Sequence, residues 1–207
     1  MLHDFLTCSC KSPLCIECIV KKLNKLRFEK QQVSAECVIS AMKSHFSLDV
    51  QDDAFDFLST LLGKINSPLI KEALVISFVQ TITCSNEYCL HTETEDLHEP
   101  SLSISINGHD VQSCIENFQR KQAIPEYVCD NCQMIKTSSI IQEITSCSRF
   151  VILQIKIFNN SQAKLQSPHI NNTIKLAGDN YKLKAEILHL GGSILEGHYY
   201  SKKKSII

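Results

Sequence analysis

Residues 83–89, Thr-Cys-Ser-Asn-Glu-Tyr-Cys, and residues 127–132, Tyr-Val-Cys-Asp-Asn-Cys, each place two cysteines in a short, turn-rich loop. Zinc binds four thiolates tetrahedrally, and a short loop lets two sulfurs point at one ion. The sequence between the loops is too long for a small independent finger, so the fold must bring them together, as at the end of a β-ribbon. We therefore predict one structural zinc site formed by Cys84, Cys89, Cys129 and Cys132. The alternative is four unrelated thiols.

A second group of cysteines lies near the N-terminus, with the spacing Cys-x-Cys-x4-Cys-x2-Cys. It could close another zinc site just before the first predicted helix, with His3 as a substitute ligand. The ligands would be Cys8, Cys10, Cys15 and Cys18. The alternative is partial occupancy or buried thiols. Four thiolates leave no open coordination position, so Zn²⁺ at either site would be structural and would perform no chemistry.

Composition narrows the class of protein. The chain has 207 residues, of which 43% are hydrophobic, so it is long enough to bury a core. It contains 11 cysteines and shows no signal peptide at the N-terminus. We therefore expect an intracellular location, in the nucleus or the cytoplasm, where clustered cysteines hold metal rather than form disulfides. The net charge of −1 argues against direct nucleic-acid binding, and the apolar runs are too short to span a membrane.

The first third of the chain has helical periodicity, and the rest has strand character. Helices are predicted over residues 16–26, from near Ser34 to Phe46, and from Asp52 or Asp53 to Leu62. Segments rich in Ile, Val, Thr and Phe predict strands later in the chain. These strands are residues 75–83, 101–106, 138–144, 150–158 and 181–189, with one helix at residues 110–119. Helices followed by strands indicate an α+β architecture.

Several segments, in order, match motifs of one enzyme family. Residues 52–58, Asp-Asp-Ala-Phe-Asp-Phe-Leu, resemble a Gln-Asp-Ala-His-Glu-Phe-Leu helix, and residues 150–158 resemble a strand that ends in His-Leu-Lys-Arg-Phe. The two cysteine pairs follow a zinc-bearing region, and residues 181–189 with 197–201 resemble a box that contains a catalytic histidine. Together they resemble the catalytic domain of the ubiquitin-specific protease family, the thiol peptidases that cleave isopeptide bonds at the C-terminus of ubiquitin.

The resemblance implies a papain-like fold in three parts. Residues 1–73 would form thumb-like helices with the N-terminal cysteine cluster, residues 74–148 the zinc-bearing β fingers, and residues 149–207 the β palm. It also implies that His198 is the catalytic base, that Gly197 and Tyr199 bind substrate beside it, and that His189 is structural. A glycine before the base would leave room for a narrow peptide tail.

The N-terminal cluster gives a finer resemblance. Asp4-Phe5-Leu6, followed by the cysteines from Cys8 to Cys18, is similar to the ubiquitin protease subunit of the SAGA-type transcriptional coactivator, with Cys8 where that subclass has a histidine. This implies ubiquitin or a ubiquitinated protein such as a histone as partner, and coactivator subunits as further partners.

Two parts of the family's catalytic machinery have no counterpart in the sequence. The reaction needs a thiolate at a helix N-terminus, a histidine base and an orienting Asp or Asn, but no Gly-Asn-Thr-Cys box and no third residue are present. Asp52, Phe55 and Ile157 also replace the family's Gln, His and Arg. We expect the sequence to be part of an active deubiquitinase that is cut at both ends. One alternative is an inactive relative that binds ubiquitin or a coactivator partner, and another is a zinc-stabilised nucleic-acid or scaffold module.

Overall fold

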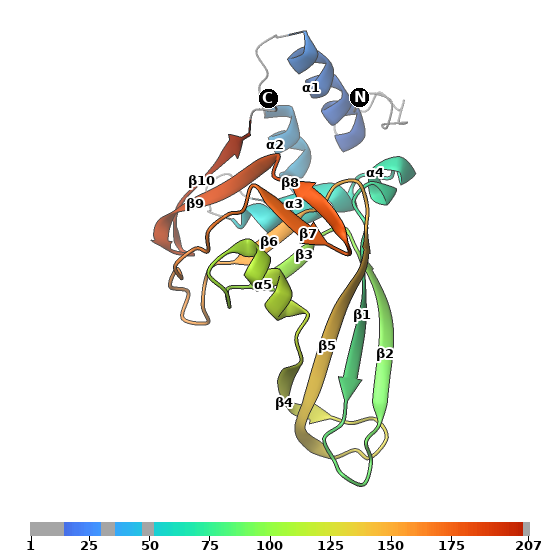
Figure 1. The fold of residues 1–207 in the computed structure, drawn as a ribbon. Helices are drawn as coiled ribbons and strands as arrows, with labels where there is room; N and C mark the ends of the chain where they lie inside the picture. Colours follow the sequence, from blue (N-terminus) through green and yellow to red (C-terminus); the bar gives the residue numbers. More distant parts are fainter. Residues whose placement is uncertain (1–14, 30–35, 47–51, 205–207) are drawn as a thin grey trace. The chain divides into compact units, whose positions relative to one another are not determined.

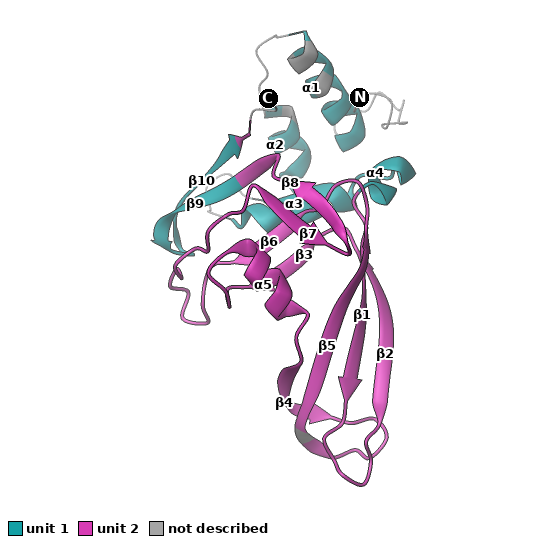
Figure 2. Ribbon diagram, viewed as in Figure 1, with its two compact units in different colours: residues 1–73, 187–202 teal, residues 74–186, 203–207 magenta. Residues whose placement is uncertain are grey.

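The computed structural model describes residues 15–29, 36–46 and 52–204. The chain divides into two compact units, residues 1–73 with 187–202 and residues 74–186 with 203–207 (Figure 2). Among the described residues, no helix is both long enough and apolar enough to cross a bilayer.

The first unit contains four helices in its described part (Figure 1). They are α1 (Ile16–Phe28), α2 (Glu36–Met42), α3 (Ala54–Gly63) and α4 (Pro68–Glu72). Ile16, Met42 and Ile65 form the buried centre of this unit, and partly buried apolar residues of α1, α2 and α3 pack around them. The buried Glu17 carboxylate accepts a hydrogen bond from the Asn66 backbone N–H, which ties α1 to the turn before α4.

The third helix, α3, begins where the sequence predicts it, after Asp53. The Asp53 carboxylate accepts a hydrogen bond from the Phe55 N–H at 2.5 Å, as expected for an N-cap. The prediction that Phe46 lies on the second helix is wrong, because α2 ends at Met42. Ser44 and His45, which follow soon after, are weaker helix formers, and Phe46 instead packs against Phe57 with ring centroids 5.3 Å apart. The predicted start of the second helix, near Ser34, lies outside the described residues.

A β-hairpin completes the first unit. It is made of β9 (Ala185–Ser193) and β10 (Glu196–Lys203), which pair only with each other among the described strands. The predicted strand over residues 181–189 is therefore divided. Its first part belongs to β8 (Asp179–Lys182), and its second part begins β9.

The second unit is built on a four-stranded antiparallel sheet with the order β2-β1-β5-β4. The strands are β1 (Ile76–Thr83), β2 (Thr92–Glu99), β4 (Gln122–Val128) and β5 (Ile135–Cys147). This long ribbon is the lower part of Figure 1. β3 (Leu102–Ser105) pairs in parallel with β6 (Leu153–Lys156), and β7 (Thr173–Leu176) pairs with β8.

The core of the second unit lies where α5 (Val111–Phe118) packs on these strands. Fully buried side chains come from β1, β3 and α5, including Ile76, Ile104 and Ile115, each 0% exposed. Cys114 is also 0% exposed.

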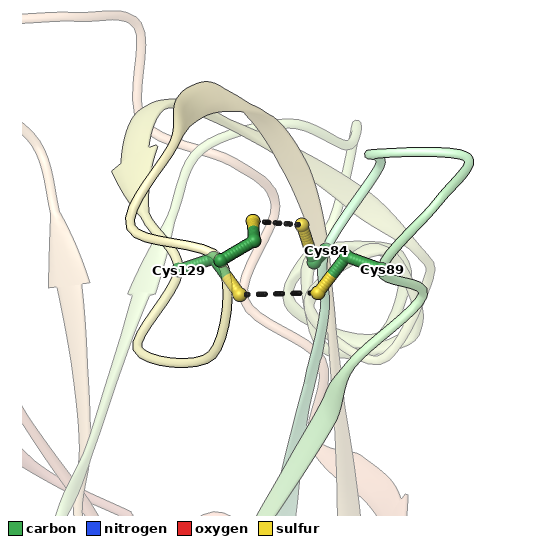
Figure 3. A group of neighbouring side chains, drawn as sticks. Cys84, Cys89 and Cys129 are labelled. Atoms are coloured by element: carbon green, nitrogen blue, oxygen red, sulfur yellow. Dashed lines mark hydrogen bonds between the residues drawn. The ribbon is translucent and has the colours of Figure 1, made fainter.

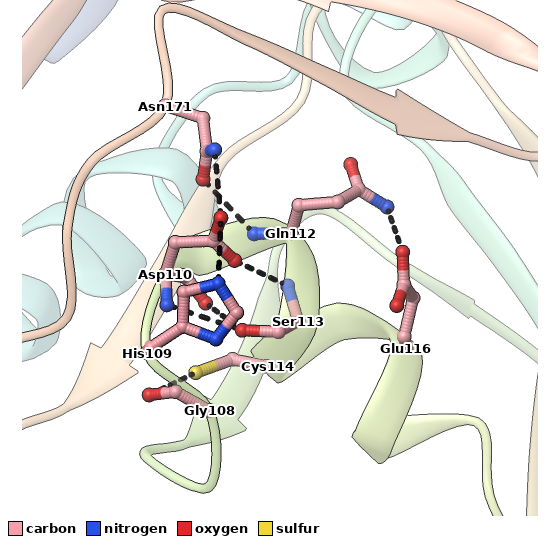
Figure 4. A network of polar contacts seen from close by, with 8 residues as sticks. All are labelled: Gly108, His109, Asp110, Gln112, Ser113, Cys114, Glu116 and Asn171. Carbon is pink, nitrogen blue, oxygen red and sulfur yellow. Dashed lines mark hydrogen bonds and ion pairs between the residues drawn. The ribbon is translucent and has the colours of Figure 1, made fainter.

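A polar network fixes the N-terminus of α5 (Figure 4). The Asp110 carboxylate accepts a hydrogen bond from the Ser113 N–H at 2.7 Å, and the Ser113 hydroxyl oxygen accepts one from the Asp110 N–H at 3.1 Å. The two residues therefore form a capping box. The Asn171 amide donates to Asp110 and accepts from the Gln112 N–H. The Ser113 backbone and hydroxyl and the Asn171 amide together lower the pKa of Asp110 to about 2.

The α+β class is confirmed, since helices precede a strand-rich region. Four strands were not predicted, namely β2, β4, β7 and β10. In β2, Thr-Glu-Thr-Glu-Asp-Leu-His-Glu has almost no buried face, and β4 contains Pro125 and a register shift between Ile124 and Tyr127. The division into residues 1–73, 74–148 and 149–207 stays a prediction.

Candidate metal centre and histidine hairpin

The four predicted ligands of the first zinc site meet at the end of the four-stranded ribbon (Figure 3). Cys84 directly follows β1, Cys89 lies in the loop before β2, and Cys129 directly follows β4. Cys132 lies in the turn between β4 and β5. Strand pairing brings the two loops together, and the four sulfurs all lie within 4.8 Å of one another.

The spacing of the sulfurs fits a tetrahedral metal ion. A tetrahedron with metal–sulfur bonds of about 2.3 Å has sulfur–sulfur edges of about 3.8 Å. The Sγ atoms of Cys84 and Cys132 are 3.9 Å apart, and those of Cys89 and Cys129 are 3.8 Å apart. Nearby N–H groups support negative charge on the sulfurs, because the Asn86 backbone donates to Cys84 at 3.4 Å and the Asn131 amide to Cys89 at 3.2 Å.

Each cysteine loop has a residue with positive φ directly after its second cysteine. Leu90 follows the second cysteine of the first loop with φ of 48°, and Gln133 follows the second cysteine of the other loop with φ of 54°. The Leu90 N–H donates to the Asn86 carbonyl, and the Gln133 N–H donates to the Cys129 carbonyl. These left-handed residues close each turn, so the two cysteine loops, which we call the knuckles, share this backbone feature.

The thiols have unequal affinities for protons. The Asn86 N–H lowers the pKa of Cys84, but burial and the thiols of Cys129 and Cys132 outweigh it and raise the pKa to about 11. The Met134 backbone and the Asn86 side chain lower the pKa of Cys132 to about 6. Four thiolates this close repel one another, so their full deprotonation requires a cation among them. The donor set therefore fits a metal ion.

The second predicted cysteine cluster is only partly described. Cys8 and Cys10 lie outside the described residues. Cys15 and Cys18 are half-buried at the start of α1. Among the described residues, the ribbon cluster is the group of cysteine, histidine and acidic side chains that could hold a metal ion.

The predicted catalytic histidine lies on the β9–β10 hairpin. His198 is exposed and follows Gly197, which has φ of 140°. A Cβ at residue 197 would lie 2.0 Å from the Leu190 carbonyl oxygen and 2.6 Å from the His189 ring. The structure thus gives a reason for this glycine within the hairpin itself, while its role in substrate binding stays a prediction.

His189 and Tyr199 hold the hairpin in place. His189 is 5% exposed, and its ring packs edge-on against Tyr199 with centroids 4.9 Å apart. Burial and the carboxylates of Asp53 and Asp56 raise the pKa of Tyr199, while the Ala54 backbone N–H at its oxygen opposes the shift. Tyr199 therefore links the histidine strand to the N-terminus of α3, the helix that contains the motif at residues 52–58.

An apolar cavity of about 600 Å³ lies beside this link within the first unit. Side chains of α2 and α3, including Met42 and Phe57, line one side, and Tyr199, Tyr200 and Ile187 line the other. Sequence reasoning did not find this cavity, because its walls come from segments more than a hundred residues apart.

Two fungal proteins are similar to this chain in sequence. The chain is 28% identical to these two fungal proteins over an alignment of 149 residues, which covers 63% of this chain. They are named "Probable ubiquitin carboxyl-terminal hydrolase creB" in Aspergillus niger and "Ubiquitin carboxyl-terminal hydrolase creB" in Emericella nidulans. The chain spans 19% of the length of these relatives. No family model matches the chain.

Solved structures match almost all of the chain. The ubiquitin-bound SAGA DUB module Ubp8/Sgf11/Sus1/Sgf73 contains a chain that superposes with a TM-score of 0.75 at 20% identity, over 98% of this chain and 54% of that one. The same module bound to ubiquitin aldehyde gives a TM-score of 0.71 at 17% identity, over 99% and 55%. The chain has the fold of the protein in these ubiquitin-bound modules, and its sequence is similar to ubiquitin carboxyl-terminal hydrolases. The predicted fold class and family resemblance are confirmed.

The two sets of predicted site residues lie in different compact units of the chain. The metal knuckles belong to the second unit, and the histidine hairpin belongs to the first. The chain spans about half the length of the chains in the matched structures. The fold match therefore does not by itself show the activity or the substrates of the whole protein.

Proposed function

We propose that this domain is part of a thiol-dependent deubiquitinase and contributes ubiquitin-binding surface and the histidine base of isopeptide hydrolysis. The observation that carries the proposal is the fold match, over 98% of the chain, to a chain of a SAGA DUB module solved with monoubiquitin. The two closed knuckles and the ordered histidine hairpin support it, because they are the two features that the family motifs predict.

His198 would act as the general base. It is exposed on a strand whose position is fixed by buried His189 and by Tyr199, so its imidazole is accessible to a substrate while its backbone is held. A base of this kind takes the proton from a thiol and later returns it to the leaving amine. Gly197 and Tyr199 would contact the substrate beside it.

The metal in the knuckles would be zinc with a structural role. Four sulfur ligands and a closed coordination sphere are typical of structural zinc sites, which stabilise the folded state. The Zn²⁺ ion would hold the ends of β1, β4 and β5 together through Cys84, Cys89, Cys129 and Cys132. Cys8, Cys10, Cys15 and Cys18 would form the second site.

The structural likeness to SAGA DUB modules supports a narrower proposal about partners. We infer that the substrate is a ubiquitinated protein such as a histone, that coactivator subunits bind the domain, and that it acts in the nucleus. The net charge of −1 supports binding of protein rather than of nucleic acid.

A second candidate is an inactive relative that binds ubiquitin or a coactivator. The residues Asp52, Phe55 and Ile157, which replace the Gln, His and Arg of the family motifs, favour it. Both candidates predict that the purified 207-residue chain binds ubiquitin and fails to react with ubiquitin that carries a C-terminal electrophile.

The experiment has two arms. In the first, the chain is titrated with ubiquitin by calorimetry, and saturable binding is expected; no binding would contradict both candidates. In the second, the polypeptide that contains this sequence is isolated from its own cells and treated with the electrophilic probe. A covalent adduct at a cysteine supports the deubiquitinase, and binding without an adduct supports the inactive relative.

A further inference from the structure

A small polar hollow in the second unit has no role in the proposed function described so far. It has a volume of about 240 Å³ and lies where β3 and β6 meet the end of α5 and the neighbouring strands β4 and β5. Its lining residues are Ser103, Ser105, Asn107, Phe118, Gln122, Gln142 and Lys156. The lining contains one cation and several neutral hydrogen-bonding groups, and it contains no carboxylate.

Internal hydrogen bonds fix most of the wall. The Ser103 hydroxyl donates to Gln154 at 2.5 Å, and the Gln142 amide donates to Gln80 at 3.0 Å. The Gln122 amide donates to the carbonyls of Asn117 and Phe118, at 3.4 and 3.2 Å. Gln122 thereby covers the carbonyl oxygens at the C-terminus of α5, whose partial negative charge would otherwise disfavour an anion.

Two donors remain available in this fixed wall. Ser105 and Lys156 are paired residues on the adjacent parallel strands β3 and β6, and both are exposed. Within the described residues, neither side chain makes a hydrogen bond or an ion pair. An ammonium group and a hydroxyl group side by side form a charge-assisted site for an acceptor oxygen.

The chemistry of the hollow selects a carboxylate. A single cation matches a single negative charge, whereas a phosphate dianion usually requires several cations or backbone N–H groups. The fixed wall lowers the cost of ordering the site when the anion binds. We propose that this hollow accepts a carboxylate side chain on the surface of ubiquitin, with Lys156 and Ser105 as its donors. This assignment of the partner rests on the proposed function.

The first arm of the test does not depend on ubiquitin. The chain is titrated with sodium acetate and, separately, with acetamide, an uncharged molecule of the same shape, at constant ionic strength. Saturable shifts of the Ser105 and Lys156 backbone amide signals are expected by NMR with acetate alone, and they should disappear in Lys156→Gln. Equal responses to acetate and acetamide, or no response, would overturn the anion site.

The second arm measures ubiquitin binding by calorimetry. Lys156→Gln should weaken binding about ten-fold, as expected for the loss of one charge-assisted hydrogen bond. Lys182→Gln, which removes an exposed cation of β8 outside the hollow, should change the affinity less than about two-fold. Wild-type affinity in Lys156→Gln would overturn the assignment to ubiquitin. Acetate binding by a chain that does not bind ubiquitin would instead contradict the proposed function and leave the anion site in place.

Discussion

At the scale of single residues, Gly197 shows most clearly how the hairpin constrains its sequence. Its φ of 140° and the contact that a Cβ would make with the Leu190 carbonyl leave no room for a side chain. Gly197→Ala should therefore lower the free energy of unfolding by roughly 1–3 kcal/mol. Gly192→Ala is the matched control, because a Cβ there meets nothing within 4 Å. Chemical denaturation of both variants measures the difference. Equal stability of the two variants would contradict the close backbone contact at residue 197.

Asp110 gives a prediction about pH. Its pKa is about 2 in the folded chain, below the ordinary value of 3.8, because the Ser113 backbone, the Ser113 hydroxyl and the Asn171 amide bind its charged form. The stabilisation is fully present above pH 3.8 and is lost as the pH falls toward 2. Asp110→Asn keeps the cap but removes the charge. The stability difference between wild type and this variant should therefore shrink between about pH 4 and pH 2 in denaturation measurements, and a constant difference would contradict the assigned cause.

At the scale of elements, α5 and its contacts form the core of the second unit. Ile115 is 0% exposed and contacts the buried cluster of β1 and β3, so Ile115→Ala should cost about 2–5 kcal/mol of unfolding free energy. Ile141→Ala, at a position 40% exposed on β5, should cost less than about 1 kcal/mol. Comparable losses in the two variants would mean that the core lies elsewhere.

The metal knuckles lie at the end of the four-stranded ribbon, and we expect a metal ion in them to stabilise the folded chain. We expect removal of the metal by a chelator to lower the thermal unfolding temperature, because four thiolates at 3.8–3.9 Å spacing repel one another without a cation. Cys129→Ser should bind one zinc ion fewer than wild type in native mass spectrometry. Cys147→Ser, which changes a thiol outside the cluster, should keep the wild-type metal content. An unchanged metal content in Cys129→Ser would exclude the ribbon site.

Among the helices, strands and loops, some features could be predicted from the sequence and others could not. The cysteine spacing and the capping residues Asp53 and Asp110 are local signals, so the knuckles and the starts of α3 and α5 could be inferred. The strand β2 could not, because it is an edge strand with charged residues on both faces and lacks the alternation of a half-buried strand. The hollow around Lys156 was also missed, since its walls come from five elements that only the fold brings together.

At the scale of the whole molecule, the resemblance in sequence motifs and the match in fold are two separate observations that agree. The motifs are dispersed from residue 52 to residue 201, and the fold match covers 98% of the chain, although identity to the matched structures is only 17–20%.

The closing of the two knuckles on one ion is the claim on which the fingers region, the family assignment and the proposed ubiquitin surface all depend. Zinc X-ray absorption spectroscopy on a Cys15→Ser/Cys18→Ser variant, which removes ligands of the other predicted site, measures the knuckles directly. We predict a zinc ion with four sulfur neighbours at about 2.3 Å. A zinc ion with nitrogen or oxygen neighbours, or a folded chain without zinc, would contradict the account.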